Sequence, residues 1–461
     1  MYWLKMFFLF FDDDLINLIL DFSVKYAQQN NRHGFCLSKG ELLNFLGIML
    51  FSGYHTLPQV PLYWSNEEDK GIDIVKKCMS RNRFQAIKRN IHLSDNSNLD
   101  KDDKFSKLRP YLDAWGVFAH NLSIYEQMVP YFGRHSCKMF IKGKPVRFGF
   151  KQWCLCSSDG YLFYSIPYAG AIANKERTSL GLGRETVNNL LANVDYPARH
   201  SIFFDNFFSS YQLLVDLKNK GLYATGTIRS NRTGHCPLVE PKIMSKRERG
   251  AYDCAYDKNN KISMVRWNDN SIVTICSNVY SVEPINQVRR YNRKEKREIH
   301  VQEPNVIARY NRCMGGVDLH DNGIANYRIR VMGNIWWWPI FCNSIDSIIV
   351  NCWKLYNSVY QNKISQLDFK SYVALRLMKT DRLVEVRFDD CGLTVTRHPN
   401  KARRRCRECH SHTVHMCKRC KVHLHVSCFE KYHQKWIYFC RPTSQWCVNA
   451  TQKNMEVLCT G

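Results

Sequence analysis

Apolar residues recur every three or four positions along the first quarter of the chain, the spacing that places them on one face of an α-helix. Residues 12–29, 38–54 and 79–95 show this spacing most clearly. The first of these stretches begins with three aspartates, whose charges favour a helix N-terminus. The pattern therefore predicts a helical domain over residues 1–115.

The opening segment, "MYWLKMFFLFF", has the apolar character of a signal peptide. However, its one basic residue is the internal Lys5, three aspartates follow it, and no small-residue cleavage site is present. We interpret this segment as the start of an amphipathic helix. No run of 18 apolar residues occurs in the chain, so we expect no membrane-spanning helix.

From residue 116 the apolar runs become shorter and alternate in type. Residues 151–168 contain two short strand-like runs around a Ser-Asp-Gly turn, and residues 200–210 begin as a buried strand that ends in an aspartate. Residues 186–195 and 211–221 have helical spacing. Alternating strands and helices predict an α/β fold with a mixed sheet over residues 116–229.

Residues 230–300 carry short alternating runs and dense charge, which favours a β-rich insertion. It ends in "RRYNRKEKR" (289–297), a basic run that is either a solvated loop or a contact to nucleic acid. Residues 301–375 lead into an aromatic-rich helical segment, where we interpret the three consecutive tryptophans as core rather than as a base-stacking surface. A polar linker follows over residues 376–403.

The net charge of the chain indicates which class of partner it binds. The 461 residues include 66 Lys and Arg against 41 Asp and Glu, a net charge of +25. Because this excess is spread along the chain, it favours nucleic acid over a membrane surface as the partner. Hydrophobic residues make up 45% of the chain, which excludes a disordered protein.

Eight of the 20 cysteines lie beyond residue 400, which indicates a reducing compartment and metal binding rather than a disulfide framework. Over residues 404–440, two C-x2-C pairs lie closer together than in a zinc ribbon, which favours an interleaved cross-brace. One structural Zn2+ would take Cys406, Cys409, His425 and Cys428. A second would take Cys417, Cys420 and His433, with a fourth ligand left open and Cys440 as one candidate. Residues 441–461 form a tail.

Several strings together resemble the piggyBac transposases and the host genes derived from them: "MSRNRF", "EQMVPYFGR", "KGKPVRFGFK", "FFDNFFSS", "GTIRSNR" and "GGVDLHDN". The resemblance covers nearly the whole chain. It implies an RNase H-like catalytic core, over residues 116–229 and 301–375, interrupted by the β-rich insertion. It also implies an N-terminal helical domain for dimerisation and DNA binding, and a zinc domain that binds the transposon end.

The family's chemistry rests on three aspartates that hold two Mg2+ ions for attack on a phosphodiester. By the resemblance, the second aspartate is Asp205 and the third is Asp318, with Asp321 as an additional acid. The first should precede "EQ", where this chain has Tyr125. Because Mg2+ demands hard oxygen ligands, a neutral phenol is a poor replacement.

Three interpretations of Tyr125 follow. Glu126 could replace the missing carboxylate, although neighbours on a strand face opposite sides unless a bulge shifts them. Tyr125 could itself be a nucleophile, but the Arg and His set of tyrosine recombinases has no counterpart in the chain. The favoured interpretation is a change tolerated in a decaying or domesticated copy.

The sequence leaves two main function classes and a third that has less support. The favoured one is a domesticated, transposase-derived protein that binds double-stranded DNA without cutting it, as a homodimer in the nucleus. The alternative is an active cut-and-paste transposase that acts at TTAA sites with Mg2+. The third uses the cross-brace as a protein-interaction module, as RING and PHD domains do.

Overall fold

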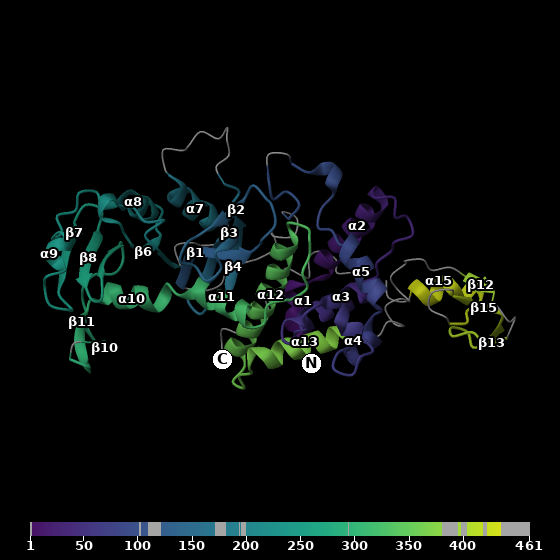
Figure 1. The fold of residues 1–461 in the computed structure, drawn as a ribbon. Helices are drawn as coiled ribbons and strands as arrows, with labels where there is room; N and C mark the ends of the chain where they lie inside the picture. Colours follow the sequence, from purple (N-terminus) through teal and green to yellow (C-terminus); the bar gives the residue numbers. More distant parts are fainter. Residues whose placement is uncertain are drawn as a thin grey trace. The chain divides into compact units, whose positions relative to one another are not determined.

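The structure is a computed structural model (Figure 1), and it describes residues 2–100, 103–108, 121–170, 181–192, 194, 200–293, 295–379, 395–397, 403–417 and 422–434. The chain divides into two compact units. Unit 1 comprises residues 1–12, 49–60 and 93–374, and unit 2 comprises residues 13–48, 61–92 and 375–461. The domain limits expected from the sequence stay predictions.

The helical part of unit 2 contains α2 (Asp13–Gln29), most of α3 (Lys39–Ser52), α4 (Asp73–Cys78) and α5 (Arg81–Asn90). Ser80 caps α5, because its side chain accepts a hydrogen bond from the backbone N–H of Arg83. The Arg83 guanidinium in turn pairs with Glu41 of α3 at 2.7 Å. One basic residue of the "MSRNRF" string is therefore a structural contact within this unit.

The opening segment differs from the expectation of one amphipathic helix. A first helix, α1 (Tyr2–Phe10), ends before Asp12, and α2 begins at Asp13. Asp13 and Asp14 lie in the first turn of α2, where carboxylates stabilise the exposed N–H groups of a helix start. Phe7 and Phe11 are fully buried, so the apolar segment is part of a folded core.

A mixed sheet of nine strands forms the centre of unit 1. Its strands are β1 (Asn121–Pro130), β2 (Lys138–Phe140), β3 (Phe148–Ser157), β4 (Leu162–Pro167), β5 (Ser201–Phe204), β6 (Tyr223–Thr227), β7 (Tyr252–Asp257), β8 (Ile262–Asn268) and β9 (Ile272–Ser277). The order is β2-β3-β1-β5-β6-β9-β8-β7, with β4 also paired to β3. Only β1–β5 and β5–β6 are parallel among these pairs.

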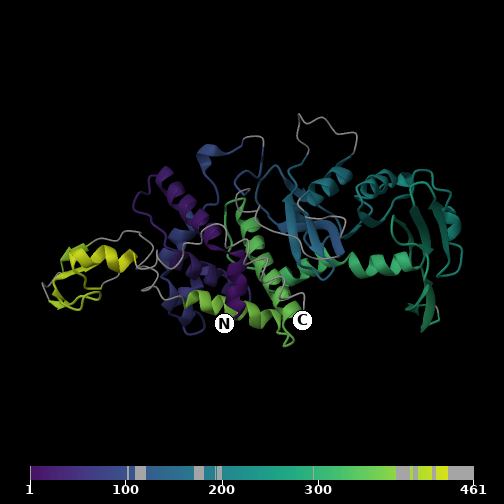
Figure 2. The ribbon, with the colours of Figure 1, turned by 180° about the vertical axis from the view of Figure 1, so that it is seen from behind.

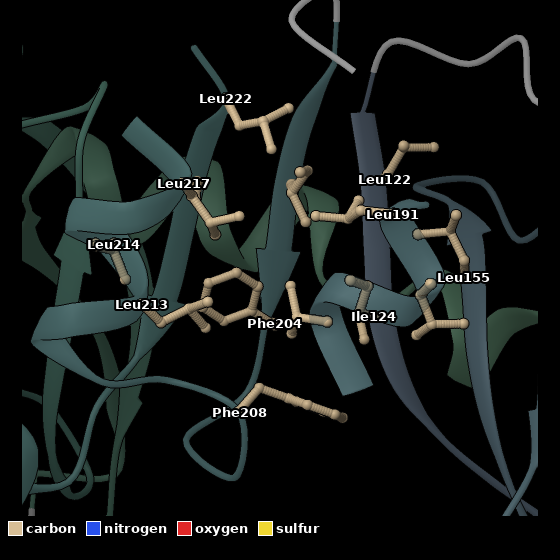
Figure 3. Close-up of a cluster of buried hydrophobic side chains, with 14 of the residues drawn as sticks. Leu122, Ile124, Leu155, Leu191, Phe204, Phe208, Leu213, Leu214, Leu217 and Leu222 are labelled. Atoms are coloured by element: carbon tan, nitrogen blue, oxygen red, sulfur yellow. The ribbon is translucent and has the colours of Figure 1, made fainter. Parts of the chain in front are cut away.

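One face of the sheet is covered by α7 (Leu182–Leu191) and α8 (Tyr211–Asn219). Figure 3 shows Leu122 and Ile124 of β1 and Phe204 of β5 pointing into this core, where leucines of α8 meet them. All three are fully buried. Because side chains alternate along a strand, Ser123, Tyr125 and Gln127 of β1 face the opposite side.

The opposite face carries helices from the second half of the chain, α10 (Asn305–Cys313), α11 (Gly316–Asn326) and α12 (Trp338–Val359). Helix α13 (Gln366–Met378) follows them in the chain. Figure 1 shows β1, β3 and β4 lying between α7 and the pair α11 and α12. Trp337 and Trp338 are each 2% exposed, which agrees with the interpretation of the tryptophans as core.

The residues between β6 and α10 are mostly strand, and three of the strands, β7–β9, continue the central sheet. A short helix, α9 (Pro241–Met244), precedes β7, and β10 (Asn286–Asn292) pairs with β11 (Arg297–Glu303) in a hairpin that extends away from β7–β9 (Figures 1 and 2). The described residues of the basic run, 289–293 and 295–297, therefore belong to strand ends and a hairpin turn, and whether they contact nucleic acid stays a prediction. Short 3-10 helices lie at Val60–Trp64, Asn96–Asn98 and Ser230–Arg232.

The cysteine-rich segment of unit 2 contains β12 (Val395–Arg397), β13 (Arg404–Arg405), β14 (His412–Thr413), β15 (His415–Cys417) and α15 (Val426–Gln434). It forms two small antiparallel pairs, β12–β15 and β13–β14. Among the helices that the structure describes, none combines the length and apolar character needed to cross a membrane.

Candidate functional site

Two adjacent parallel strands bring Tyr125, in the middle of β1, beside Asp205, which follows the end of β5. The β1–β5 register pairs Ile124 with Phe204, so Tyr125 and Asp205 are the next positions on the two chains. The Asp205 Oδ1 atom accepts a hydrogen bond from the backbone N–H of Phe207 at 2.9 Å, which holds the carboxylate at the start of the following turn. The sequence places these residues 80 positions apart, and the sheet makes them neighbours.

Helix α11, which carries Asp318 and Asp321, packs directly against β1 and β3. A Cβ atom added at Gly316 would lie 2.0 Å from the carbonyl oxygen of Ser157 and 2.4 Å from the Ser123 hydroxyl, so only glycine allows this approach. His320, fully buried, holds the helix further along through Gly160 O and Ser347 Oγ, both at 3.1 Å. Burial lowers the pKa of His320 to about 4.

The two acids of α11 have different surroundings. Asp318 is exposed, whereas Asp321 accepts a hydrogen bond from the Gln127 amide of β1. The Gln127 side-chain oxygen accepts from Asn343 of α12 at 2.9 Å, which fixes the amide's orientation. Burial raises the pKa of Asp321 to about 6, and the charge of Asp318 adds to this effect.

The Tyr125 ring lies on the α11 side of β1, against a small apolar cluster that includes Cys154, Cys156 and Val317. The Lys144 ammonium nitrogen is 4.0 Å from the centroid of this ring, within cation–π range. Burial lowers the pKa of Lys144, but Tyr125 and the Glu126 carboxylate outweigh it, so the pKa is raised overall. The residue at the position of the expected first aspartate is therefore in contact with a protein cation.

Glu126 extends from β1 toward two lysines. Its carboxylate pairs with Lys151 of β3, and its Oε1 atom is 3.4 Å from Lys144 Nζ. The Lys151 nitrogen also lies 3.9 Å from the centroid of the Trp153 ring, and Trp153 belongs to the core under α7 and α8. Trp153 is paired with Glu126 across β1 and β3, so Glu126 is on the opposite face from Tyr125.

The charges of these groups act on Asp205. Burial raises the pKa of Asp205, as does the charge of Glu126, whereas the Phe207 amide and the charges of Lys144 and Arg229 lower it. Lys144 also lowers the pKa of Asp321. One ammonium group thus interacts electrostatically with the phenol and with carboxylates from β1, β5 and α11.

The residues around Tyr125 do not fit the two Mg2+ ions that the family resemblance implies. In the part of the chain that the structure describes, just one group of three or more Asp, Glu, His or Cys side chains has all its ligand atoms within 4.8 Å of one another, and it lies in the cysteine-rich segment. Beside Asp205, the phenol of Tyr125 and the ammonium group of Lys144 replace one of the hard anionic ligands that Mg2+ needs. We assign no metal to these acids.

The group that satisfies this criterion is Cys406, Cys409, His425 and Cys428, the set expected for the first zinc. The Cys409 Sγ atom lies 3.2 Å from His425 Nδ1, and His425 Nε2 lies 3.1 Å from the carbonyl oxygen of His412. Burial raises the pKa of Cys406, but hydrogen bonds from the backbone of Cys409 and His425 outweigh it and lower the pKa to about 6. Three thiols and an imidazole in this arrangement fit a closed, structural Zn2+ site.

The second expected zinc set is largely outside the described residues. Cys417 ends β15 and is fully buried. Cys420 and Cys440, and the side chain of His433, lie outside the described part of the structure. The second zinc therefore stays a prediction.

Sequence reasoning did not identify Lys144, Lys151 or Gln127 as site residues. All three belong to strings that carry the family resemblance, but nothing in their spacing indicates which acids they meet. A signal existed for Lys144: the segment 131–150 has no acid of its own to pair with its lysines. Their partners lie on β1, which only the folded sheet brings close.

Comparison with known proteins gives the family. The family described as "Transposase IS4" matches residues 4–353. The chain is 36% identical to human PiggyBac transposable element-derived protein 3 over 448 residues, which cover 92% of this chain and 75% of that protein. It is 34% identical to human PiggyBac transposable element-derived protein 2 over 450 residues, which cover 93% of this chain and 76% of that protein.

The fold has a counterpart among solved structures. A chain of the piggyBac transposase synaptic complex with hairpin DNA, determined by cryo-electron microscopy, superposes with a TM-score of 0.64 at 22% sequence identity. The likeness covers 82% of this chain and 80% of that one. This likeness concerns the fold, and the two human relatives show that this chain belongs to the family of piggyBac transposable element-derived proteins.

Proposed function

We propose that this protein is a transposase-derived protein that binds double-stranded DNA and does not cleave it. The observation that carries the proposal is the contact between Lys144 and the Tyr125 ring at the position of the family's first aspartate. A divalent cation needs anionic oxygens there, and the chain instead supplies a neutral ring and a positive charge. Repulsion from Lys144 and the loss of one ligand both weaken cation binding.

The core around this site is RNase H-like in our proposal. The run β4-β3-β1-β5-β6, antiparallel on one side of β1 and parallel on the other, supports this assignment. In such a core Asp205, Asp318 and Asp321 are the remaining members of the catalytic set. Glu126 is a poor replacement for the first member, because it faces the opposite side of β1 and pairs with Lys144 and Lys151.

DNA as the partner is supported by the net charge of +25 and by the structural neighbour, whose description names hairpin DNA. Transposon-end sequences are the DNA class that the family suggests. The cysteine-rich segment would add a zinc-stabilised DNA contact. A homodimer located in the nucleus, domesticated for a host role, completes the proposal.

Two measurements test it. Binding of the full chain to duplex DNA should weaken steeply as salt rises, because each phosphate contact releases a counterion. In a cleavage assay with Mg2+ and TTAA-flanked ends, the wild-type protein should leave the DNA intact, and Tyr125→Asp should restore some nicking. Asp205→Ala in that background is the inactive control.

Nicking by the wild-type protein that Asp205→Ala abolishes would overturn the proposal. It would favour the alternative, an active cut-and-paste transposase at TTAA sites. Two-metal chemistry contributes several kcal/mol to such a reaction, so its loss should reduce the rate by about three orders of magnitude or more.

A further inference from the structure

The exposed phenylalanines of the protein gather in one short segment. Among the described residues, the phenylalanines that are exposed are Phe132, Phe140 and Phe148, with 77%, 55% and 44% of their surfaces accessible. Phe132 follows β1, and the other two lie on β2 and β3, at one edge of the sheet. Apolar rings left in water at this density mark a surface that binds something.

Two of these rings form an ordered pair. Phe140 and Phe148 are directly opposite each other in the β2–β3 register, and their ring centroids are 4.8 Å apart at an interplanar angle of 38°. Close cross-strand neighbours restrict each other's rotamers. The pair therefore presents aromatic surface with little conformational entropy left to lose on binding.

Buried aromatic residues anchor this edge. Phe150, two positions after Phe148 on β3, is fully buried and stacks on Tyr131 with centroids 4.8 Å apart. The Trp336 ring lies 6.2 Å from it. Because residues two apart on a strand share a face, the exposed pair continues a rigid aromatic layer rather than hanging from a loop.

The segment that carries the pair is basic. Residues 131–150 contain five Lys or Arg and no Asp or Glu. Arg134, Lys142 and Arg147 are exposed, and no ion pair to an acid is found for them among the described residues. The loop between the strands, which contains Lys142, is closed by a 2.9 Å hydrogen bond from the Ile141 N–H to Arg147 O.

We propose that this basic aromatic edge, defined as Phe132, Arg134, Phe140, Lys142, Arg147 and Phe148, is a stacking surface for unpaired nucleobases. The cations match a phosphate backbone, and the rings offer faces on which bases stack irrespective of sequence. A duplex presents phosphates and base edges, but its base faces are stacked on one another and are covered except at the ends. The rings therefore select DNA whose bases are accessible.

The inference rests on the proposed function for its partner, DNA, and adds which form of DNA meets this edge. A protein partner and a second copy of the chain are the other possible occupants. The absence of acids from the segment and the number of its cations favour a polyanion over either. The experiment separates the three.

The test compares binding of the full, zinc-loaded chain to a single-stranded oligonucleotide and to a duplex of equal length, by fluorescence anisotropy. A second oligonucleotide carries 2-aminopurine, whose emission changes when its base stacks on a ring. The test variant is Phe140→Ala/Phe148→Ala. Phe140→Leu/Phe148→Leu keeps apolar surface without a ring face, and Tyr256→Ala removes a ring that is 57% exposed on β7 as the matched control.

We expect the alanine and leucine pairs each to weaken single-strand binding by about tenfold or more, to abolish the 2-aminopurine signal, and to leave duplex binding within about twofold. Tyr256→Ala should match the wild type. Lys142→Ala/Arg147→Ala should weaken both DNA forms and reduce the salt slope by about one to two counterions. Unchanged thermal unfolding of the variants shows that these exposed changes leave the fold intact.

Several results would overturn the inference. No single-strand binding by the wild-type protein, or binding unaffected by the alanine pair, removes the stacking role while duplex binding still supports the proposed function. Full affinity in the leucine pair shows that an apolar contact suffices, and a change of oligomeric state in the alanine pair identifies a second copy as the occupant. Loss of all DNA binding by the wild type defeats both proposals.

Discussion

The ammonium nitrogen of Lys144 lies 4.0 Å from the centroid of the Tyr125 ring, and Tyr125 on β1 is beside Asp205, the residue that follows β5. A ring face attracts a monovalent protein cation but offers no oxygen pair to a hydrated divalent one. The positive charge near these acids is therefore the ammonium group of Lys144 and not a bound divalent cation. Lys144 is the counter-charge for Asp205 and for Asp321 of α11.

This pairing predicts how divalent cations bind. With the cysteine-rich segment saturated by zinc, the wild-type protein should bind no Mn2+ at Asp205 and the acids of α11. Tyr125→Asp should create at least one weak Mn2+ site, and Tyr125→Asp/Lys144→Met should bind it about tenfold more tightly or better, because a nearby positive charge is removed. Titration of free Mn2+ by electron paramagnetic resonance measures both.

Asp205→Asn in the double-variant background should abolish the new site, and Lys138→Met on β2 is the matched charge control. If the wild-type protein already binds Mn2+ and Asp205→Asn removes that binding, the assignment of Lys144 as the counter-charge is wrong.

The buried carboxyl group of Asp321 predicts a pH-dependent stability. Its folded-state pKa, about 6, lies above the unfolded value of about 4, so the group stabilises the fold at low pH and that contribution is lost as the pH rises through 6. Asp321→Asn should therefore increase the free energy of unfolding by about 2 kcal/mol at pH 7.5, and by about half as much at pH 5. Urea unfolding at the two pH values measures this difference.

Asp318 provides the control for that experiment, because it lies on the same helix and is exposed. Asp318→Asn should change the free energy of unfolding by less than about 0.5 kcal/mol at either pH. A gain from Asp321→Asn that is the same at both pH values would point to packing rather than to charge.

A buried ion pair joins α12 and α13. Lys370 Nζ and Asp346 Oδ1 are 2.6 Å apart and both side chains are 2% exposed, while Asp346 Oδ2 also accepts the Ile329 N–H at 2.9 Å. Lys370→Met should lower the free energy of unfolding by about 3 kcal/mol or more, because it leaves a buried carboxylate without its cation.

Replacing both partners tests whether charge is the cause. Lys370→Met/Asp346→Leu should be less destabilised than Lys370→Met alone, since no unpaired charge remains. The exposed pair between Lys77 and Asp73 is the comparison, and Lys77→Met should produce no measurable change. A double variant less stable than the single one would contradict the charge explanation.

The cysteine-rich segment should contain close to two zinc ions per chain by elemental analysis of the full protein. Cys406→Ala should remove one of them, because a tetrahedral site with three ligands left binds zinc far more weakly. The exposed Cys254 is the matched control, and Cys254→Ala should remove none. If the wild-type protein contains one zinc ion, the assignment of the Cys406 site stands and that of the second set is wrong. If it contains no zinc, both assignments are wrong.

Periodicity and spacing predict local features well in this chain. The strand that ends at Asp205, the helix stopped near Gly221 and the two tryptophans in the core follow from short-range patterns. The first zinc set followed from C-x2-C spacing, because four ligands on two short turns leave few geometric choices. Each of these depends on residues close together in sequence.

Long-range relationships were not predictable in the same way. Nothing in the sequence pairs Lys144 with Tyr125, because the loop before β3 has to fold back over β1 first. The break between α1 and α2 was also missed, although the three aspartates at the start of α2 had been interpreted as favouring a helix N-terminus. The resemblance named Asp318 as the third aspartate and Asp321 as an additional acid, but it did not indicate that helix packing leaves Asp318 exposed and Asp321 half-buried.

The continuous strand β3 fixes the distance between the basic aromatic edge and Tyr125. It runs from Phe148, in the basic aromatic edge, past Cys154, which pairs with Tyr125 across β1. Six residues of strand, at about 3.3 Å each, set these two points about 20 Å apart, which is close to six nucleotides of a stacked strand. A single strand held at the phenylalanines would thus reach Tyr125 with a fixed register, and the length of β3, rather than any base contact, would decide which phosphate arrives there.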